Sequence, residues 1–193
     1  MQRICVFCGS SPGYDPRFMA AATAFGQALA ANGIGLVYDG ASVGLMGAVA
    51  DAVMGGGGDV IGVIPQALVA KEVAHHGLKD LRVVGSMHER KALMAELADG
   101  FVALPGGIGT FEELFEVWTW AQLGDIEKPC ALYNVAGFYD GLTAFLDHVV
   151  QQGFMKALHR EMLIVADDSA TLLDRLGAYT APAQTKWIKA DER

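Results

Sequence analysis

The sequence predicts a single α/β domain with a doubly wound, Rossmann-like parallel sheet. Short apolar runs alternate with longer helical patterns, the order typical of strand–helix–strand units. The apolar runs carry few polar residues on either face, as strands covered by helices on both sides do. Loops of small residues follow several of these runs, and sheets of this kind bind ligands at the carboxyl ends of their strands. We therefore expect a ligand site where these loops converge.

Seven strands are expected, because seven short apolar runs are bounded by glycine, proline or polar residues. They are expected over residues 4–8, 34–38, 60–64, 81–84, 101–104, 130–133 and 162–165. Pro65 and Pro105 end two of them, because proline lacks the amide hydrogen that a central strand donates. The segment 66–79 has no regular pattern.

Six helices are expected in the longer stretches that separate or follow these runs. They are expected over residues 16–31, 45–53, 87–98, 110–123, 139–152 and up to 176 at the end. Asn32 and Gly33 end the first helix, and Asp168 or Ser169 caps the last. Residues 1–179 form the predicted domain, and the polar tail 180–193 is expected to be loose or docked on a partner chain.

Composition limits the classes of protein to consider. With 193 residues, 52% hydrophobic and 19% charged, the chain is long enough for one well-filled core. The mean hydropathy of +0.31 is high, but no apolar run has the ~20 residues of a membrane span, so no membrane partner is expected. A net charge of −8 argues against binding to nucleic acid.

The N-terminal residues and the cysteines point to a cytoplasmic protein without a metal. The chain enters its first strand pattern without the layout of a signal peptide. Cys5 and Cys8 have the spacing of a redox pair, but in a strand they point to opposite faces, so redox or metal use is not expected. The five histidines show no ligand pattern. We expect no metal and no cofactor.

The stretch 104–113 joins the end of a strand to a glycine loop and the start of a helix. Gly106, Gly107 and Gly109 allow backbone N–H groups to approach an anion without intervening Cβ atoms. The dipole and free N–H groups of the following helix favour negative charge at the same point. The stretch therefore predicts a phosphate-binding loop.

Other interpretations of this stretch fit less well. Thr110 and Glu113 have the spacing of a capping box, but a cap does not account for the three preceding glycines. The third glycine of a dinucleotide fingerprint is missing, since Glu112 holds its position, and no Gly-Lys-Ser/Thr sequence follows for a Walker loop.

Two charged residues occupy positions that need a partner. Arg90 lies on or beside the apolar side of its helix, where it either pairs with a nearby carboxylate or points into the cleft with Glu113. Lys91 lies about 100° further round and offers a second positive contact. Glu113 shares a face with Val117 and Trp120, whereas Glu112 fits a solvated position.

Paired motifs give the chain a resemblance to a known family. Residues 105–113 match P-G-G-x-G-T-x-x-E and residues 87–91 match M-x-x-R-K, the motifs of the LONELY GUY family of cytokinin riboside 5′-monophosphate phosphoribohydrolases. Further blocks that look like the family extend this resemblance over roughly residues 4–165. Some members were formerly labelled lysine decarboxylases, but nothing in the sequence argues for a pyridoxal-phosphate site.

The resemblance implies hydrolysis of the N-glycosidic bond of a purine nucleoside 5′-monophosphate, AMP or an N6-modified AMP, to free base and ribose 5-phosphate. It implies that Arg90 and Glu113 are the catalytic pair. It also implies a homodimer, which fits the two apolar faces of the helix 110–123. Together, the loop chemistry and the resemblance predict substrate contacts from Glu72, Arg90, Lys91, Gly106, Gly107, Ile108, Gly109, Thr110, Phe111, Glu112, Glu113 and Thr119.

One departure from the family pattern leaves an alternative open. Where the family usually reads Gly-Gly-Gly before S-V-G-L-M-G, this chain has Asp39, Gly40 and Ala41, which adds an anion near the expected site. The alternative is a carrier that binds a nucleotide or phosphorylated cofactor without turnover. A nicotinamide oxidoreductase ranks third, because its fingerprint is incomplete.

Overall fold

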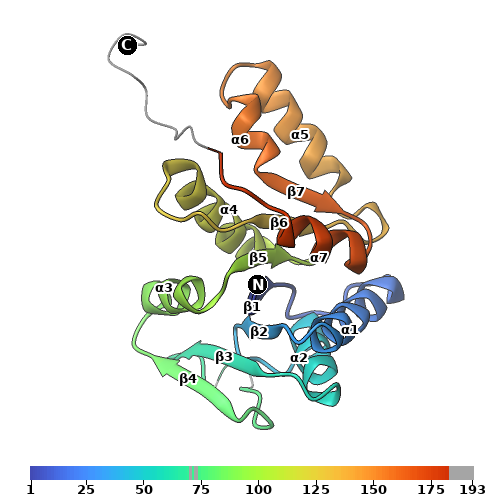
Figure 1. The fold of residues 1–193 in the computed structure, drawn as a ribbon. Helices are drawn as coiled ribbons and strands as arrows, with labels where there is room; N and C mark the ends of the chain where they lie inside the picture. Colours follow the sequence, from blue (N-terminus) through green and yellow to red (C-terminus); the bar gives the residue numbers. More distant parts are fainter. Residues whose placement is uncertain (70, 72–73, 183–193) are drawn as a thin grey trace.

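The computed structural model describes residues 1–69, 71 and 74–182, which form one parallel sheet covered by helices (Figure 1). Seven strands pair in the order β4-β3-β2-β1-β5-β6-β7, and every pairing is parallel. The strands are β1 Arg3–Phe7, β2 Gly35–Tyr38, β3 Val60–Pro65, β4 Asp80–Val84, β5 Gly100–Ala103, β6 Cys130–Tyr133 and β7 Leu163–Ala166. The predicted doubly wound sheet is confirmed.

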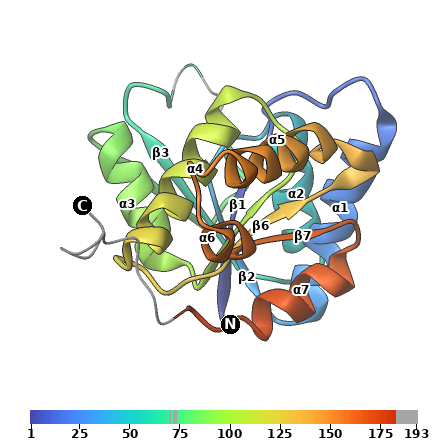
Figure 2. The ribbon, with the colours of Figure 1, turned by 90° about the horizontal axis from the view of Figure 1, so that it is seen from above.

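The helices form a layer on each face of the sheet, as Figures 1 and 2 show together. One layer contains α1 Pro16–Ala31, α2 Gly44–Gly55 and α7 Ser169–Gly177. The other contains α3 Met87–Leu97, α4 Ile108–Leu123, α5 Asp140–Gln151 and α6 Ala157–Glu161. A short 3-10 helix, η1 Val135–Gly137, follows β6.

The order of the strands reverses direction at β1, which places a topological switch point beside it. Ile4 in β1 lies opposite Leu36 of β2 on one side and Gly100 of β5 on the other. The chain runs outward from β1 to β4, returns through α3, and then runs outward from β5 to β7. The loops after β1 and β5 therefore leave the same edge of the sheet in opposite directions, which opens a crevice there.

Alternate residues of β1 belong to the two halves of the core. Ile4 and Val6 pack with α1 and α2, whereas Cys5 and Phe7 pack with α3 and α4. Cys5 and Cys8 fall in different halves, as the strand period predicts, and both are buried free thiols. Burial is the main reason why the pKa values of these thiols lie above the ordinary range.

The start of α4 differs from the expectation. The helix begins at Ile108 with Gly107 as its N-cap, two residues before the expected start at Thr110. The capping-box interpretation of Thr110 and Glu113 is therefore wrong, because both residues lie inside the helix and no side chain caps it. The expected start followed the last glycine of the loop, but Ile108 and Gly109 already belong to the helix.

Two short elements were not predicted, and one predicted segment lies outside the described residues. Helix α6 and η1 are too short to show a period in the sequence. Asp168 caps α7, as predicted, by accepting a hydrogen bond from the Thr171 N–H (2.9 Å). Of the tail 180–193, residues 183–193 lie outside the described part of the chain.

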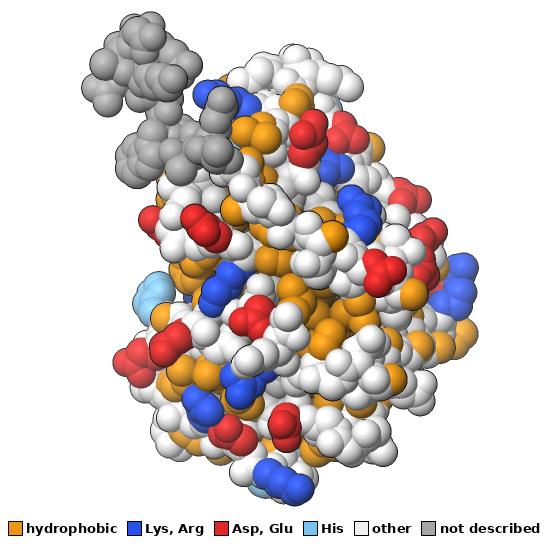
Figure 3. Space-filling view, viewed as in Figure 1, with side chains coloured by type: hydrophobic (Ala, Val, Ile, Leu, Met, Phe, Trp, Pro, Cys, Tyr) orange, Lys and Arg blue, Asp and Glu red, His pale blue; other side chains and the backbone are white. Residues whose placement is uncertain are grey.

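The surface mixes charged and apolar side chains. On the face shown in Figure 3, acidic and basic groups are interspersed around apolar areas. The large exposed apolar side chains include Ile108, Phe145 and Phe154. In the part of the chain that the structure describes, no helix is both long and apolar enough to cross a membrane.

Gly26 tests the packing of α1 against α2. A Cβ atom at Gly26 would lie 2.5 Å from the Val49 carbonyl oxygen and 2.7 Å from the Ala52 Cβ atom. We predict that Gly26→Ala lowers the free energy of unfolding by about 1–3 kcal/mol, because the two helices must separate. Urea titration measures this value.

The matched control is Gly141→Ala in α5, where nothing lies within 4 Å of the added atom. This substitution is expected to raise the free energy of unfolding by about 0.4–1 kcal/mol, because alanine restricts the unfolded chain. Equal effects of the two substitutions would contradict the close approach of α1 and α2.

Candidate active site

A cleft of about 650 Å³ lies at the carboxyl ends of β1, β2 and β5. Its volume is within the range of small-molecule sites. The loops after Phe7, Tyr38 and Ala103 converge here, as the glycine-rich loops of the sequence predict. The cleft is lined by Cys8, Gly9, Ser10, Asp39, Ala41, Val43, Met46, Lys71, Met87, Arg90, Gly107, Ile108, Gly109, Thr110 and Glu113.

The loops after β1 and β5 are joined by backbone contacts. The Gly9 N–H donates to the Pro105 carbonyl oxygen (3.0 Å), and the Leu104 N–H donates to the Phe7 carbonyl oxygen (2.9 Å). A Cβ atom at Gly106 would lie 2.1 Å from Thr110 Oγ1 and 2.9 Å from the Gly9 nitrogen. Gly106 is therefore required for the close approach of these two loops.

The N-terminus of α4 faces the cleft with its backbone N–H groups. The first hydrogen bond of the helix runs from the Phe111 N–H to the Gly107 carbonyl oxygen (3.2 Å). The N–H groups of Ile108, Gly109 and Thr110 come before it, so they point out of the N-terminal end of the helix. Cβ positions at Gly107 and Gly109 have no neighbour within 4 Å, which leaves space for a ligand. This arrangement suits a phosphate group.

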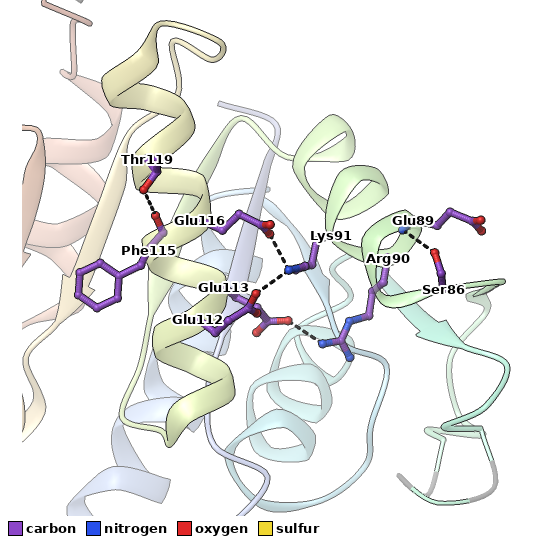
Figure 4. Close-up of polar contacts among 9 residues, drawn as sticks. All are labelled: Ser86, Glu89, Arg90, Lys91, Glu112, Glu113, Phe115, Glu116 and Thr119. Carbon is purple, nitrogen blue, oxygen red and sulfur yellow. Dashed lines mark hydrogen bonds and ion pairs between the residues drawn. The ribbon is translucent and has the colours of Figure 1, made fainter. Parts of the chain in front are cut away.

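The first turn of α3 positions Arg90. Ser86 Oγ accepts a hydrogen bond from the Glu89 N–H (3.1 Å), and Glu89 Oε2 accepts one from the Gly85 N–H (2.8 Å). A cap of this kind, considered and disfavoured for Thr110 and Glu113 in the sequence, fixes the start of α3 instead. Arg90 follows directly, and its side chain points from α3 toward α4 (Figure 4).

Arg90 joins two carboxyl groups in the floor of the cleft. Arg90 Nη2 lies 2.8 Å from Glu113 Oε1, and Arg90 Nη1 lies 3.8 Å from Asp39 Oδ1. The three residues are only 5%, 3% and 4% exposed for Arg90, Glu113 and Asp39. The sequence left two possibilities for Arg90, pairing with a carboxylate or pointing into the cleft with Glu113. The structure combines them, because Arg90 pairs with carboxylates at the cleft. A buried cluster of two acids and one base is sensitive to protonation.

The Glu113 carboxyl group holds its proton unusually strongly. Burial, followed by the negative charge of Asp39, raises the pKa of Glu113 from 4.5 to about 9, although Arg90 acts in the opposite direction. Because the two acids interact directly, this value belongs to the pair rather than to one residue. A protonated Glu113 repels an anion at the N-terminus of α4 less than an ionised one does.

Several predicted binding residues lie outside the lining of this cleft. Lys91 Nζ contacts Glu112 Oε1 (2.6 Å) and Glu116 Oε2 (2.9 Å), so it joins α3 to α4 (Figure 4). Thr119 Oγ1 donates to the Phe115 carbonyl oxygen in its own helix (2.6 Å). Lys91 therefore connects two helices, Thr119 bonds within one, and neither side chain lines the cleft.

The remaining predicted residues are placed as follows. Phe111 packs edge-on against Tyr139, whose hydroxyl donates to the Leu104 carbonyl oxygen (2.6 Å) at the end of β5. Gly106 does not line the cleft, but it allows the loops after β1 and β5 to approach each other closely. Glu72 lies outside the described residues. The structure thus brings together Arg90, Gly107, Ile108, Gly109, Thr110 and Glu113.

Other lining residues were not assigned to the site by sequence reasoning. Ser10, Val43, Met46, Lys71 and Met87 line the cleft. The signal that identifies most of them is position, because they follow the carboxyl ends of strands or begin the next helix. Among the described residues, no group of three or more His, Cys, Asp or Glu side chains is arranged to hold a metal ion.

Comparison with known families gives one match along most of the chain. Residues 46–176 match the family model described as "Possible lysine decarboxylase". The chain is 51% identical to a "Probable cytokinin riboside 5′-monophosphate phosphoribohydrolase" of Oryza sativa subsp. japonica, over 94% of this chain and 74% of that protein. It is 47% identical to a cytokinin riboside 5′-monophosphate phosphoribohydrolase of Arabidopsis thaliana, over 92% and 83%.

Solved structures with the same fold are much less similar in sequence. The molybdenum cofactor binding protein of Rippkaea orientalis superposes with a TM-score of 0.69 at 20% identity, over 92% of this chain and 96% of that one. The molybdenum cofactor carrier protein of Chlamydomonas reinhardtii gives a TM-score of 0.67 at 22% identity, over 92% and 98%. These likenesses support the fold alone.

The raised pKa of Glu113 predicts how stability depends on pH. The folded protein binds a proton that the unfolded chain releases above about pH 4.5, so this group's contribution to stability is complete below that pH. The contribution declines as the pH rises toward about 9, by at most ~1.4 kcal/mol per pH unit. We predict that Glu113→Gln, which cannot titrate, reduces this decline.

Denaturant titrations of both proteins from pH 5 to pH 9 measure the difference, because titrating groups elsewhere affect both proteins alike. If the difference in the free energy of unfolding between wild type and Glu113→Gln stayed constant over this range, the strongly held proton would be excluded.

Proposed function

This chain belongs to the family of the cytokinin riboside 5′-monophosphate phosphoribohydrolases, described by its family model as possible lysine decarboxylases, and we propose that it is an enzyme of that activity. It hydrolyses the N-glycosidic bond of a purine nucleoside 5′-monophosphate to free base and ribose 5-phosphate. The observation that carries this proposal is the contact of 2.8 Å between Arg90 and Glu113 beside the N-terminus of α4. AMP and N6-modified AMP are the proposed substrates.

The phosphate group of the nucleotide binds at the start of α4 in this proposal. The N–H groups of Ile108, Gly109 and Thr110 point out of the helix there, and the helix dipole favours the negative charge. Gly106 and Gly107 keep the loop free of side chains. A phosphate held at this end places the ribose over the next turn of the helix, where Glu113 lies.

The Glu113 carboxyl group stabilises the positive charge that forms on the ribose and binds the attacking water. Departure of the base leaves positive charge on C1′ and the ring oxygen, which negative charge on the adjacent carboxyl pair stabilises. The attacking water donates a hydrogen bond to Glu113, and its oxygen bonds C1′ as the bond between C1′ and the base nitrogen breaks. Glu113 accepts the proton that the water loses, and the base leaves with one proton, so that water supplies OH to the sugar and H to the base overall. Arg90 holds Glu113 in place and compensates the buried charge.

The other predicted contacts have supporting roles in this proposal. Lys91 ties α3 to α4 through Glu112 and Glu116, which keeps Arg90 within reach of Glu113. Phe111 packs near Tyr139, at the end of β5. For Glu72 and Thr119, substrate contact stays a prediction from family resemblance, as does the cytoplasmic location expected from the N-terminal sequence.

The alternative of a carrier without turnover has weaker support. The relatives that share about half of their residues with this chain are named as hydrolases. The proteins named for binding or carrying the molybdenum cofactor share only 20–22% of theirs, a level that speaks for the fold and not for the ligand.

Replacing Glu113 tests the proposed chemistry. We predict that Glu113→Gln lowers kcat for release of adenine from AMP by about 10²–10⁴-fold, because the amide cannot carry negative charge or accept the proton of water. Nucleotide binding, measured by calorimetry, is expected to persist, because the backbone of α4 supplies the phosphate contacts.

Glu127→Gln is the matched control, since this glutamate is exposed in the loop that leads to the opposite edge of the sheet. Its kcat is expected to equal that of wild type. Undiminished turnover in Glu113→Gln would refute the role assigned to this carboxyl group.

A homodimer is the proposed assembly. Phe115 and Trp120 of α4 are only partly buried within one chain, and Met87 and Ile108 at the cleft are large exposed apolar side chains. We predict that light scattering at micromolar concentration gives twice the chain mass of 20.4 kDa. A mass equal to one chain would contradict the assembly and leave the proposed reaction untouched.

A further inference from the structure

A second acid lies at the catalytic pair, from an element far from both partners in sequence. Asp39 follows β2, whereas Arg90 comes from α3 and Glu113 from α4. The two carboxyl groups lie at the two terminal nitrogens of one guanidinium group, at 3.8 Å and 2.8 Å. The two acids therefore face the same guanidinium group, and the negative charge of Asp39 helps to raise the pKa of Glu113, which favours a proton on one of the two acids.

The loop that carries Asp39 is held in place from several directions. Gly40 adopts a φ of +78°, and a Cβ atom there would lie 2.8 Å from Leu81 Cδ1, so glycine is needed. The Gly40 carbonyl oxygen accepts a hydrogen bond from the His75 N–H (2.8 Å), and Ala41 forms a bridge with Ala74. Asp39 is 4% exposed, so its carboxyl group is enclosed by the protein and faces the cluster instead of bulk solvent.

The charge of the cluster limits its protonation states. With both acids ionised, the cluster carries a net charge of −1 in a buried site that must also accept a phosphate. With one proton shared, Arg90 balances the remaining carboxylate and the cluster is neutral. This state keeps one negative charge for the sugar and avoids a second charge beside the phosphate.

We propose that Asp39 is a positioning residue for Glu113, sharing one proton with it so that the pair keeps a single negative charge during the reaction. This inference rests on the proposed function. When the proton lies on Asp39, Glu113 carries the charge, accepts a hydrogen bond from the attacking water and faces C1′. When both acids ionise at alkaline pH, repulsion weakens the binding of the nucleotide.

If the two acids share one proton, the pH above which activity falls depends on Asp39. The other titratable or charged groups around Glu113 are Arg90 of α3, Cys5 and Cys8 at β1, Glu112 of α4, and Lys71 at the cleft wall. Burial holds the pKa values of both thiols well above their usual range, so they stay neutral where the pair loses its proton. Variants of Asp39 retain Arg90, Glu112 and Lys71. A change in the alkaline limit of activity in these variants therefore comes from the pair of acids and not from these three groups.

The first experiment follows the proton without turnover. Infrared spectra of protein labelled with ¹³C in the glutamate carboxyl groups are recorded against pH for wild type, Asp39→Asn, Asp39→Gly and Glu113→Gln. A protonated glutamate band that disappears near pH 9 is expected in wild type and absent in Glu113→Gln. In both Asp39 variants the band is expected to disappear at least ~1 pH unit lower, because the neighbouring charge is gone.

The second experiment measures kcat/KM on AMP from pH 6 to pH 10. Wild type is expected to lose activity above about pH 9, mainly through a rise in KM, because Asp39 and Glu113 are then both ionised and carry two negative charges. Asp39→Asn is expected to lose this alkaline fall, because Glu113 alone never exceeds one negative charge. Asp174→Asn, a change of the same chemistry at an exposed position of α7, is expected to keep the wild-type profile.

Either of two results would overturn the proposal: a glutamate band that titrates at the same pH in wild type and in the Asp39 variants, or an alkaline fall that persists in Asp39→Asn. Circular dichroism of each variant checks that it is folded, and Asp39→Gly serves if Asp39→Asn is not. If wild type releases no base from AMP or N6-modified AMP, the proposed function fails, but the infrared titration still decides whether the two acids share a proton.

Discussion

The arrangement of this site depends on one guanidinium group buried between two carboxyl groups. Arg90 reaches Glu113 at 2.8 Å and Asp39 at 3.8 Å, and all three side chains are almost wholly removed from solvent. Charges in such a place are tolerated only when they are paired, and removal of one partner leaves an uncompensated charge. The cluster therefore joins α3, α4 and the loop after β2 to one another, and in our proposal it also limits the number of protons that the site holds.

The fold supplies this cluster with its position. The switch point beside β1 opens the crevice, and the contact between Gly9 and Gly106 sets the entry of the chain into α4. The N-terminus of α4 then offers backbone N–H groups to a phosphate, one turn before Glu113. In the proposed function, phosphate binding and sugar chemistry thus come from the same helix, and α3 brings the compensating charge to it across the sheet edge.

The strands, the glycine loop and the position of Arg90 could be predicted from the sequence, because each depends on a local pattern. The apolar runs fix the strands, the glycine loop indicates the phosphate site, and helical spacing puts Arg90 on the inner side of α3. The contact of Asp39 with Arg90 could not be predicted, because it depends on the order of strands in the sheet. The pairing of Lys91 with Glu112 and Glu116 depends on how α3 and α4 pack, and that packing has no local signal.

The product formed from a nucleotide decides directly whether this protein is a hydrolase. Purified protein is incubated separately with AMP and with N6-isopentenyladenosine monophosphate, and base and sugar phosphate are quantified by chromatography. We expect equal amounts of free base and ribose 5-phosphate from at least one of the two nucleotides. Unchanged nucleotide, at concentrations where calorimetry detects binding, would exclude the proposed hydrolysis and indicate a protein that binds nucleotides without cleaving them.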